Sequence, residues 1–411
     1  MKSNGKLHIR HKTSINHLDV YLNIIIVLTV FILTNQATAS QRVCIKSAKV
    51  LKVLYGVQAT GNGHITRARE LGTSLRKAGV QVDFVFSGRQ RQDFVFEDHE
   101  QVFGSNAKYF TGLTFVTENG KVDNFQTFLK NSRNLSELIK DIRKIDVSSY
   151  DLVINDFEPV SAWAAILNKV PIYGIANQYS FNHSKVPASL FMKYLIAPAM
   201  RLLTPIPKGK SIGLHFDSFQ SLVLPPMLSE IPNLERVKSK VTVNLPHENQ
   251  ANVVQMLTPI TSHDFHIYAD LKKFEHIELN NLPSHIHLHP TSYENYRNDF
   301  YSSEAVIVNS GFGNLSQALA AGIHLLSKPQ SGQAEQVANA KALQKLSYAE
   351  AFYSLNTKTV RNWLDNIQGQ KATKIHYPNV SKILTEWILD GAPEMNHEYI
   401  EKIWDDLVVE R

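Results

Sequence analysis

The stretch 51–86 constrains the fold more than any other part of the chain, because it has the pattern of a strand, a glycine loop, a helix and a second strand. Residues 51–55 are an apolar run, and residues 61–64 read Gly-Asn-Gly-His. In 64–78, apolar residues recur every three or four positions, which predicts an amphipathic helix. Residues 82–86 are a second apolar run. This succession predicts a parallel βαβ unit.

The rest of the chain repeats the α/β pattern in two successive halves. In the first half we expect further strands at 151–154 and 171–175 and helices at 125–145 and 160–167. In the second half we expect strands at 241–245, 265–268, 305–308 and 323–326 and helices at 314–321, 333–346, 380–389 and 397–408. The predicted fold class is α/β, with two Rossmann-like, doubly wound parallel-sheet domains facing a cleft. Ligands should bind beyond the carboxyl ends of the strands.

Length and composition limit the number of domains and the kinds of binding partner. The 411 residues exceed one ordinary core, and 222–240 carries three prolines among charged residues, as a linker does. We expect a first domain at 51–230, a second at 231–375 and C-terminal helices at 376–411. The net charge of +6 fits an anionic ligand or a membrane surface but is too diffuse to indicate nucleic acid. A single cysteine excludes a disulfide framework and a cysteine-based zinc site.

The N-terminal tail, 1–50, has three open interpretations. Residues 1–17 are polar and basic, 21–33 are apolar, and Ala-Thr-Ala at 37–39 resembles a cleavage site, so the tail imitates a secretory signal or an anchor. The apolar run is shorter than the about 20 residues of a membrane span. The other interpretations are a misassigned start, with the true chain beginning near Leu51, and a tail of another kind.

The loop with Gly61 and Gly63 matches neither common phosphate-binding motif. A P-loop needs a lysine where Asn62 stands, and the dinucleotide fingerprint needs a glycine where Thr66 stands. What remains is that glycines allow close backbone approach and that a helix N-terminus offers free N–H groups to an anion or a sugar.

His64 follows this loop and is the candidate general base. In the first turn of a helix, the positive end of the helix dipole favours the neutral imidazole. Facing a cleft, that imidazole could accept a proton from a hydroxyl group. The alternative is a histidine that only hydrogen-bonds a neighbouring loop.

The segment 309–340 predicts a ligand site in the second half. A strand end, a Gly-Phe-Gly helix start and a polar loop after the next strand follow one another. A helix N-terminus suits a diphosphate, and carboxylate and amide groups suit the hydroxyls of a sugar. The candidate binding residues are Ser310, Gly311, Gly313, Asn314, Gln317, Gln333, Glu335 and Gln336.

These motifs resemble GT-B glycosyltransferases. The stretches "VNSGFGNLSQALAAG" and "GQAEQVANA" are similar to the donor-site signature of that group, and "GNGH" is similar to the loop that opens its first domain. The similarity spans roughly 53–346 and is greatest to families 1 and 28. The stretches 55–89 and 112–122 look like those of a subfamily of uncharacterised bacterial glycosyltransferases related to the peptidoglycan N-acetylglucosaminyl transferase. The resemblance implies a GT-B fold, in which the C-terminal helices cross back to the first domain. It also implies a hexosyltransferase that uses a nucleotide-sugar donor, with a UDP-sugar expected.

The resemblance also implies residue roles. His64 would lie where acceptor and donor meet, Ser310, Gly311 and Gly313 would line the nucleotide diphosphate, and Glu335 and Gln336 would hold the donor sugar. Many relatives bind the donor ribose with a glutamate where this chain has Gln317, which can hydrogen-bond without charge-assisted strength.

The resemblance also indicates whether the sugar is transferred with inversion or retention and whether a metal ion takes part. The two glutamates that flank Gly-Phe-Gly in retaining relatives are missing, so we expect inversion. No Asp-x-Asp occurs at a strand end, so no metal is expected; helix dipoles and Lys328 would stabilise the leaving group. The nucleotide-sugar is a substrate, so no cofactor is expected.

The acceptor side is expected in the first half. Asp156 and Glu158 follow a predicted strand, so both carboxylates should lie near the cleft, where one could orient His64 or act as the base. The alternative is that one of them caps the helix at 160–167.

Two further segments have features that suit binding. The segment 188–210 is apolar with interspersed basic residues, which suits a lipid-linked or glycan acceptor and a peripheral membrane contact, or else a buried helix with a basic edge. Residues 284–290, Ser-His-Ile-His-Leu-His-Pro, would place histidines on one face of a strand. Because the sequence offers them no partnering carboxylate, an edge strand or a nucleotide contact is expected rather than a metal site.

The predicted activity is therefore sugar transfer to a hydroxyl acceptor. The alternatives are a sugar-nucleotide epimerase on the same fold and a non-catalytic glycan- or lipid-binding protein. A cytoplasmic location, with membrane association left open by the signal-like tail, follows from the use of nucleotide sugars.

Overall fold

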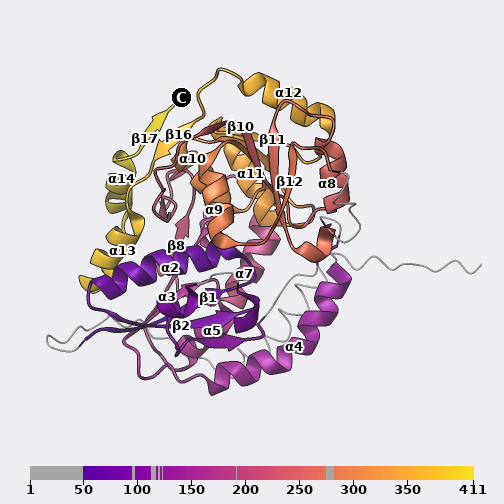
Figure 1. Ribbon diagram of the computed structural model, residues 1–411. Helices are drawn as coiled ribbons and strands as arrows, with labels where there is room; N and C mark the ends of the chain where they lie inside the picture. The colour runs from indigo at the N-terminus through magenta and orange to yellow at the C-terminus, as the bar shows by residue number, and fades with distance from the viewer. Residues whose placement is uncertain are drawn as a thin grey trace, which may run out of the picture.

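The computed structural model describes residues 50–94, 98–112, 117–118, 121–122, 124–190, 192–274 and 282–411. The apolar run at 21–33 and Cys44 lie outside these residues, so the interpretations of the N-terminal tail stay predictions. Figure 1 shows the first half of the described chain (indigo to magenta) below the second half (orange), with the C-terminal segment (yellow) along one side.

The first sheet consists of parallel strands. Its order among the described residues is β3-β2-β1-β6-β7-β8-β9. The strands are β1 (Lys52–Gln58), β2 (Gln81–Ser87), β3 (Lys108–Phe110), β6 (Leu152–Asp156), β7 (Ile172–Ala176), β8 (Ser211–Leu214) and β9 (Val223–Leu224). The chain builds outward from β1 in one direction and from β6 in the other, so the topological switch point lies between these two strands.

The second sheet is parallel as well, in the order β12-β11-β10-β13-β14-β15. Its strands are β10 (Val237–Asn244), β11 (Asp264–Ala269), β12 (Ile286–Pro290), β13 (Ser303–Asn309), β14 (His324–Lys328) and β15 (Glu350–Ala351). The switch point here lies between β10 and β13, and β12 is the edge strand that the histidine alternation predicted.

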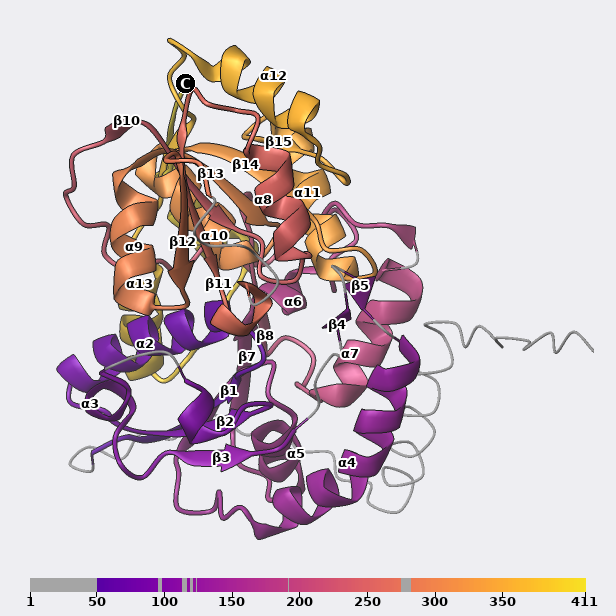
Figure 2. The ribbon, with the colours of Figure 1, turned by 45° about the vertical axis from the view of Figure 1, so that its right-hand side comes forward.

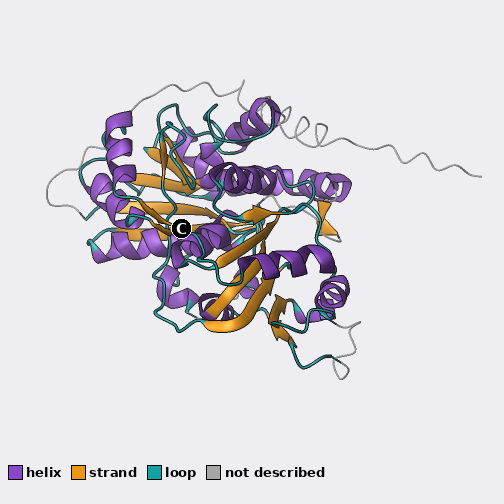
Figure 3. Ribbon diagram, turned by 90° about the horizontal axis from the view of Figure 1, so that it is seen from above, coloured by secondary structure: helices purple, strands orange, loops and turns teal. Residues whose placement is uncertain are grey.

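Helices lie on both sides of the strands (Figure 3), which is why strands such as β6 and β7 are buried along their whole length. The helices of the first half are α2 (Asn62–Lys77), α3 (His99–Phe103), α4 (Asn124–Lys144), α5 (Pro159–Leu167), α6 (Asn177–Ser180) and α7 (Ala197–Leu203). Those of the second half are α8 (Gln250–Leu257), α9 (Tyr293–Ser302), α10 (Phe312–Ala321), α11 (Ala334–Leu346) and α12 (Thr357–Ile367). The short elements are the 3-10 turns Arg91–Asp93 and Leu271–Phe274, a π-helical turn Met192–Ile196 and a hairpin of β4 (Thr117–Glu118) and β5 (Lys121–Val122). Among the described residues, every helix is too short or too polar to cross a bilayer.

The C-terminal helices pack on the first half. They are α13 (Val380–Leu389) and α14 (His397–Asp405), flanked by the antiparallel pair β16 (Lys374–His376) and β17 (Val408–Glu410). α13 lies against α2 (Figure 1), where Thr385 donates a hydrogen bond of 2.8 Å to Ser74. From α14, Trp404 Nε1 donates to the carbonyl of Val223 at 2.7 Å. The domain limits predicted above stay predictions.

Three element predictions need correction. The expected linker at 222–240 contains the edge strand β9 and the start of β10, so only 225–236 lacks regular structure. The helix expected at 397–408 ends at Asp405 and is followed by β17, whose pairing with β16 involves residues far away in the chain. α2 begins at Asn62, two residues earlier than expected, because Gly61 rather than Gly63 is its N-cap.

Candidate active site

A cavity of about 910 Å³ is lined by the loops that follow β1, β10 and β13, at the switch points of the two sheets. The two glycine loops meet there, since a methyl group on Gly313 would lie 3.5 Å from the Cα of Gly63. Gly61 and Gly311 are the N-caps of α2 and α10, and neither helix has a side-chain cap or an acidic residue in its first turn. The positive ends of two helices therefore face the same cavity.

His64 lies in the first turn of α2 and lines the cavity, as predicted. Its Nδ1 is 2.7 Å from Oδ1 of Asp156, and the two side chains are 12% and 0% exposed. Because a carboxylate only accepts hydrogen bonds, Nδ1 carries a proton, and the lone pair of a neutral imidazole here is on Nε2. Nε2 lies 3.3 Å from the amide nitrogen of Gln178 in the cavity wall.

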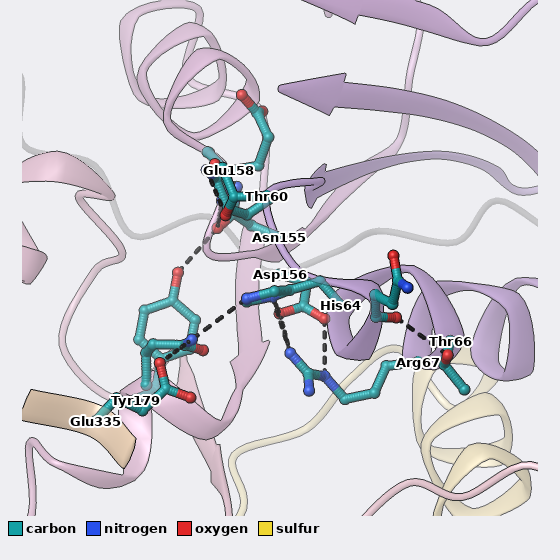
Figure 4. Close-up of polar contacts among 12 residues, drawn as sticks. Thr60, His64, Thr66, Arg67, Asn155, Asp156, Glu158, Tyr179 and Glu335 are labelled. Atoms are coloured by element: carbon teal, nitrogen blue, oxygen red, sulfur yellow. Dashed lines mark hydrogen bonds and ion pairs between the residues drawn. The ribbon is translucent and has the colours of Figure 1, made fainter. Parts of the chain in front are cut away.

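Asp156 ends β6, where its backbone is in register with Val57 of β1. Its carboxylate also takes two hydrogen bonds from Arg67, from Nε to Oδ2 at 2.9 Å and from Nη2 to Oδ1 at 2.8 Å (Figure 4). Complete burial raises the pKa of Asp156, the charges of Arg67 and His64 lower it, and the net shift is downward. Asp156 is thus a buried carboxylate that stays ionised beside the imidazole.

Glu158 has a different position from the one expected for a cleft carboxylate. It is fully buried and caps α5, accepting from the backbone N–H groups of Val160 and Ser161 at 2.7 and 2.6 Å. Phe157 between the two acids has a φ of 58°, and this left-handed turn sends their side chains in different directions. The capping alternative is therefore confirmed for Glu158, which does not line the cavity.

Most of the expected donor residues reach the cavity, but not all. The lining residues are Gly311, Gly313, Asn314, Gln317, Gln333, Glu335 and Gln336. Ser310 is fully buried, and its hydroxyl hydrogen-bonds Ser327 Oγ at 2.6 Å instead of lining the cavity. Gln336 braces its own loop as well, because its Oε1 accepts from the backbone of Gln330 at 2.9 Å.

Glu335 lies in the first turn of α11 and contacts the first half of the chain. Its Oε2 accepts a hydrogen bond of 2.8 Å from Nε2 of Gln178, the same nitrogen that faces His64 (Figure 4). Burial raises the pKa of Glu335, against the lowering influence of His64 and Arg67. The candidate base and the candidate sugar-binding acid are therefore connected through one amide group.

Lys328 does not have the position expected of a group that stabilises a leaving diphosphate. Its ammonium forms an ion pair of 2.6 Å with Glu248, and the residue does not line the cavity. Among the described lining residues, the charged side chains are Arg67, Arg89, Arg297 and Glu335. The cavity wall is thus positively charged without Lys328.

The comparison with known sequences identifies the family. Residues 51–368 match the family described as glycosyl transferase family 1. The chain belongs to this family. An uncharacterised glycosyltransferase of Methanosarcina acetivorans is 22% identical over 396 residues, covering 86% of this chain and 98% of the relative. One of Methanosarcina mazei is 22% identical over 404 residues, with the same coverage. The protein is therefore a glycosyltransferase.

Solved structures share the fold of this family 1 glycosyltransferase. The glycotransferase of kitacinnamycin matches with a TM-score of 0.52 at 13% identity, over 86% of this chain and 99% of that chain. The spinosyn rhamnosyltransferase SpnG complexed with thymidine diphosphate matches with a TM-score of 0.51 at 13% identity, over 87% and 100%. The predicted GT-B fold is confirmed.

The family 1 glycosyltransferase has cavity residues that the sequence reasoning missed. Arg67 is 4% exposed and follows His64 by three positions, so it lies on the same helix face; that spacing on a predicted helix was the signal available in the sequence. Gln178 lies two residues after β7, and Asn309 is the last residue of β13. Among the described residues, the side-chain oxygens of Gln178, Asn309 and Gln333 are buried without a hydrogen-bond donor, so they offer acceptors to a ligand.

The segment 188–210 forms one wall of the cavity. Met192, Ile196, Met200 and Leu203 recur every three or four positions and line it. On the same segment, Leu190 and Tyr194 are 72% and 77% exposed. An apolar wall and an exposed apolar edge therefore coexist on one short segment.

Proposed function

We propose that this glycosyltransferase moves a sugar from a nucleoside-diphosphate sugar to a hydroxyl group of an acceptor with an apolar body, with inversion at the anomeric carbon. The observation that carries the proposal is the pairing of His64 with buried Asp156 at the point where the two glycine loops meet. A general base oriented in this way is the group that a single displacement needs.

In the proposed reaction, the acceptor hydroxyl replaces the Gln178 amide at Nε2 of His64. Nε2 takes the hydroxyl proton while the acceptor oxygen attacks the anomeric carbon. The bond from that carbon to the phosphate oxygen breaks, and the nucleoside diphosphate leaves with the electron pair. Asp156 holds the imidazole in the required tautomer and stabilises its positive charge after proton transfer.

The donor would bind with its diphosphate at the N-terminus of α10. Free N–H groups there stabilise the leaving group, and Arg89 and Arg297 make the wall attractive to an anion. Gln317 is our candidate for the ribose, and Glu335 for the sugar hydroxyls. UDP-sugars are the first donors to test, and TDP-sugars are the second, because the matching SpnG structure contains thymidine diphosphate.

The charge of the cavity wall also supports metal-independent transfer over epimerisation. Within the described part of the chain, Glu335 is the single carboxylate that lines the cavity. A divalent ion bridging a diphosphate prefers several oxygen ligands, and an epimerase needs carboxylate acid and base groups around the donor. A wall with one carboxylate meets neither requirement, so a metal-bridged diphosphate and an epimerase reaction are both disfavoured.

The apolar wall of 192–203 suggests the nature of the acceptor. Its methionines can adapt to an irregular apolar molecule, and exposed Leu190 and Tyr194 would extend that surface toward a membrane. We therefore propose a lipid-linked or otherwise apolar acceptor and a peripheral membrane contact through 188–210, at the cytoplasmic face.

The test starts with thermal shifts against UDP, TDP, GDP and CMP and continues with the matching nucleotide-sugars. Ligand at 100 Kd should stabilise the protein by about 2.7 kcal/mol. Nucleoside diphosphate release that depends on acceptor should fall by about 10²- to 10⁴-fold in His64→Ala. His183→Gln is the control, because His183 does not line the cavity. Full turnover by His64→Ala would show that the proposed base is wrong.

A further inference from the structure

The histidine-rich edge strand β12 finds a carboxylate partner that the sequence did not reveal. β11 and β12 are in register with His266 opposite His287 and Tyr268 opposite His289, so four rings lie on one face of the sheet. Asp299 of α9 contacts this face, with its Oδ2 3.2 Å from Nδ1 of His266. α9 packs against β10 and β13, and Figure 2 shows it alongside the second sheet. The cluster of His266, His289 and Asp299 does not line the active-site cavity, so the proposed reaction does not use it.

The three side chains present their ligand atoms at the spacing of a metal site. Nδ1 of His266 is 3.0 Å from Nε2 of His289, and Nε2 of His289 is 4.0 Å from Oδ2 of Asp299. In a tetrahedral zinc site with bonds of about 2.0–2.1 Å, ligand atoms are roughly 3.3 Å apart. The rings of His266 and His289 are parallel within 4°, with centroids 5.1 Å apart. At that centroid distance, a nitrogen separation of 3.0 Å requires the rings to meet edge to edge, with the two nitrogens facing each other at hydrogen-bonding distance.

The surroundings orient the carboxylate. The Lys240 ammonium donates to Oδ1 of Asp299 at 2.6 Å, and the Tyr268 hydroxyl donates to Oδ2 at 2.5 Å. Lys240 therefore occupies Oδ1, and Oδ2 faces the two imidazoles. Hydrogen bonds from neighbouring groups commonly fix metal ligands in this way. His266, His289 and Asp299 are 21%, 32% and 19% exposed, so water can reach a fourth coordination position.

We propose that His266, His289 and Asp299 bind one Zn²⁺ ion, with water as the fourth ligand. Two imidazoles and a carboxylate are borderline ligands that suit zinc. The ion joins β12 and α9 to β11, and it contacts the carboxylate that holds Tyr268, a residue of the cavity wall. Its role is to stabilise this side of the second sheet, outside the reaction.

The experiment uses the full chain, stripped of metal with a chelator and titrated with Zn²⁺ by calorimetry and with Co²⁺ by absorption spectroscopy. We expect one equivalent of either ion, a visible Co²⁺ band typical of tetrahedral coordination, and a rise in Tm with Zn²⁺. His289→Ala and Asp299→Asn should lose the band and the rise in Tm. The loss of a residue that only hydrogen-bonds a metal ligand lowers metal affinity by about 10- to 100-fold. The Zn²⁺ affinity of these two variants should fall by more than that.

His287→Ala is the matched control, because His287 lies on the same strand and face but outside the cluster. It should bind the metal as the unmodified chain does. The proposal is overturned if the unmodified chain binds no Zn²⁺ or Co²⁺, or if His289→Ala and Asp299→Asn bind as tightly as His287→Ala does. Far-ultraviolet circular dichroism of each metal-free variant shows whether it is folded. If His289→Ala is unfolded, the comparison uses His266→Asn.

Discussion

The guanidinium of Arg67 and the carboxylate of Asp156 form a buried, two-pronged ion pair, with hydrogen bonds of 2.9 and 2.8 Å. Nη2 of Arg67 also lies 2.9 Å from Nδ1 of His64, so both groups converge on the same carboxylate oxygen. Arg67 therefore keeps Asp156 ionised and in place. Its positive charge also opposes the build-up of charge on the imidazole.

Replacement of Arg67 by Met should destabilise the fold and change the pH profile. Loss of one partner from a buried ion pair costs about 3–5 kcal/mol, measured by urea unfolding. Arg67 lowers the pKa of buried Asp156, so without it this pKa should rise, and the acid limb of kcat/KM against pH should move to higher pH.

Arg69→Gln is the control for this prediction, because Arg69 lies on the same helix and pairs with Asp98, which is 36% exposed. Loss of such a pair should cost at most about 1 kcal/mol and leave the pH profile unchanged. Equal effects of the two variants would contradict a positioning role for Arg67.

The neighbouring acids Asp156 and Glu158 should respond differently to amide substitution. Asp156→Asn can present its NH₂ group to Nδ1, which would favour the wrong tautomer, so kcat should fall by about 10²- to 10⁴-fold. Glu158→Gln weakens the cap of α5 and should lower the free energy of unfolding by about 0.5–2 kcal/mol. Turnover of Glu158→Gln below its Tm should stay near that of the unmodified enzyme. If Asp156→Asn turns over normally, Asp156 does not orient the base.

Glu335 should make stability depend on pH. Its pKa is raised in the folded state, above the about 4.3 of an unfolded glutamate, so the folded state binds more protons between the two values. The free energy of unfolding should therefore fall as pH rises above about 4.3, and Glu335→Gln should remove this part of the slope. Urea unfolding at several pH values measures it.

Glu137→Gln serves as the comparison for that measurement, since Glu137 is 52% exposed and pairs with the exposed Lys140. The dependence of its free energy of unfolding on pH should match that of the unmodified chain. A second measurement on Glu335→Ala concerns function: its affinity for the nucleotide-sugar should fall. Unchanged donor affinity would show that the loop at 333–336 does not hold the sugar.

The apolar wall should affect the acceptor but not the donor. Met200→Gln places a polar group in the wall, so KM for an apolar acceptor should rise by about 10- to 200-fold, the effect of about 1–3 kcal/mol. Nucleoside diphosphate affinity should not change. Tyr194→Gln alters the exposed side of the same segment and should weaken binding to anionic vesicles while leaving KM for a soluble acceptor unchanged. If both variants change acceptor KM and vesicle binding in the same way, the acceptor wall and the membrane-binding edge are not separate surfaces.

Local patterns in the sequence were enough to predict the elements and the approximate place of the site. The periodicity of 64–78 identified α2, the apolar runs identified the central strands, and glycines before two helices identified the loops that line the cavity. Each of these features can be recognised within a short stretch of sequence, because helices, strands and turns are specified by residues that are close together along the chain.

Tertiary structure decided which side chains act together. Asp156 reaches His64 across 92 positions and Gln178 reaches Glu335 across 157, through strand order and the approach of the two halves. The φ of Phe157 separated two acids that looked equivalent in the sequence. Similarly, Asp299 meets His266 only because α9 packs against β10, the neighbour of β11. Such contacts depend on the order of strands and the packing of helices, which no single stretch of the sequence specifies.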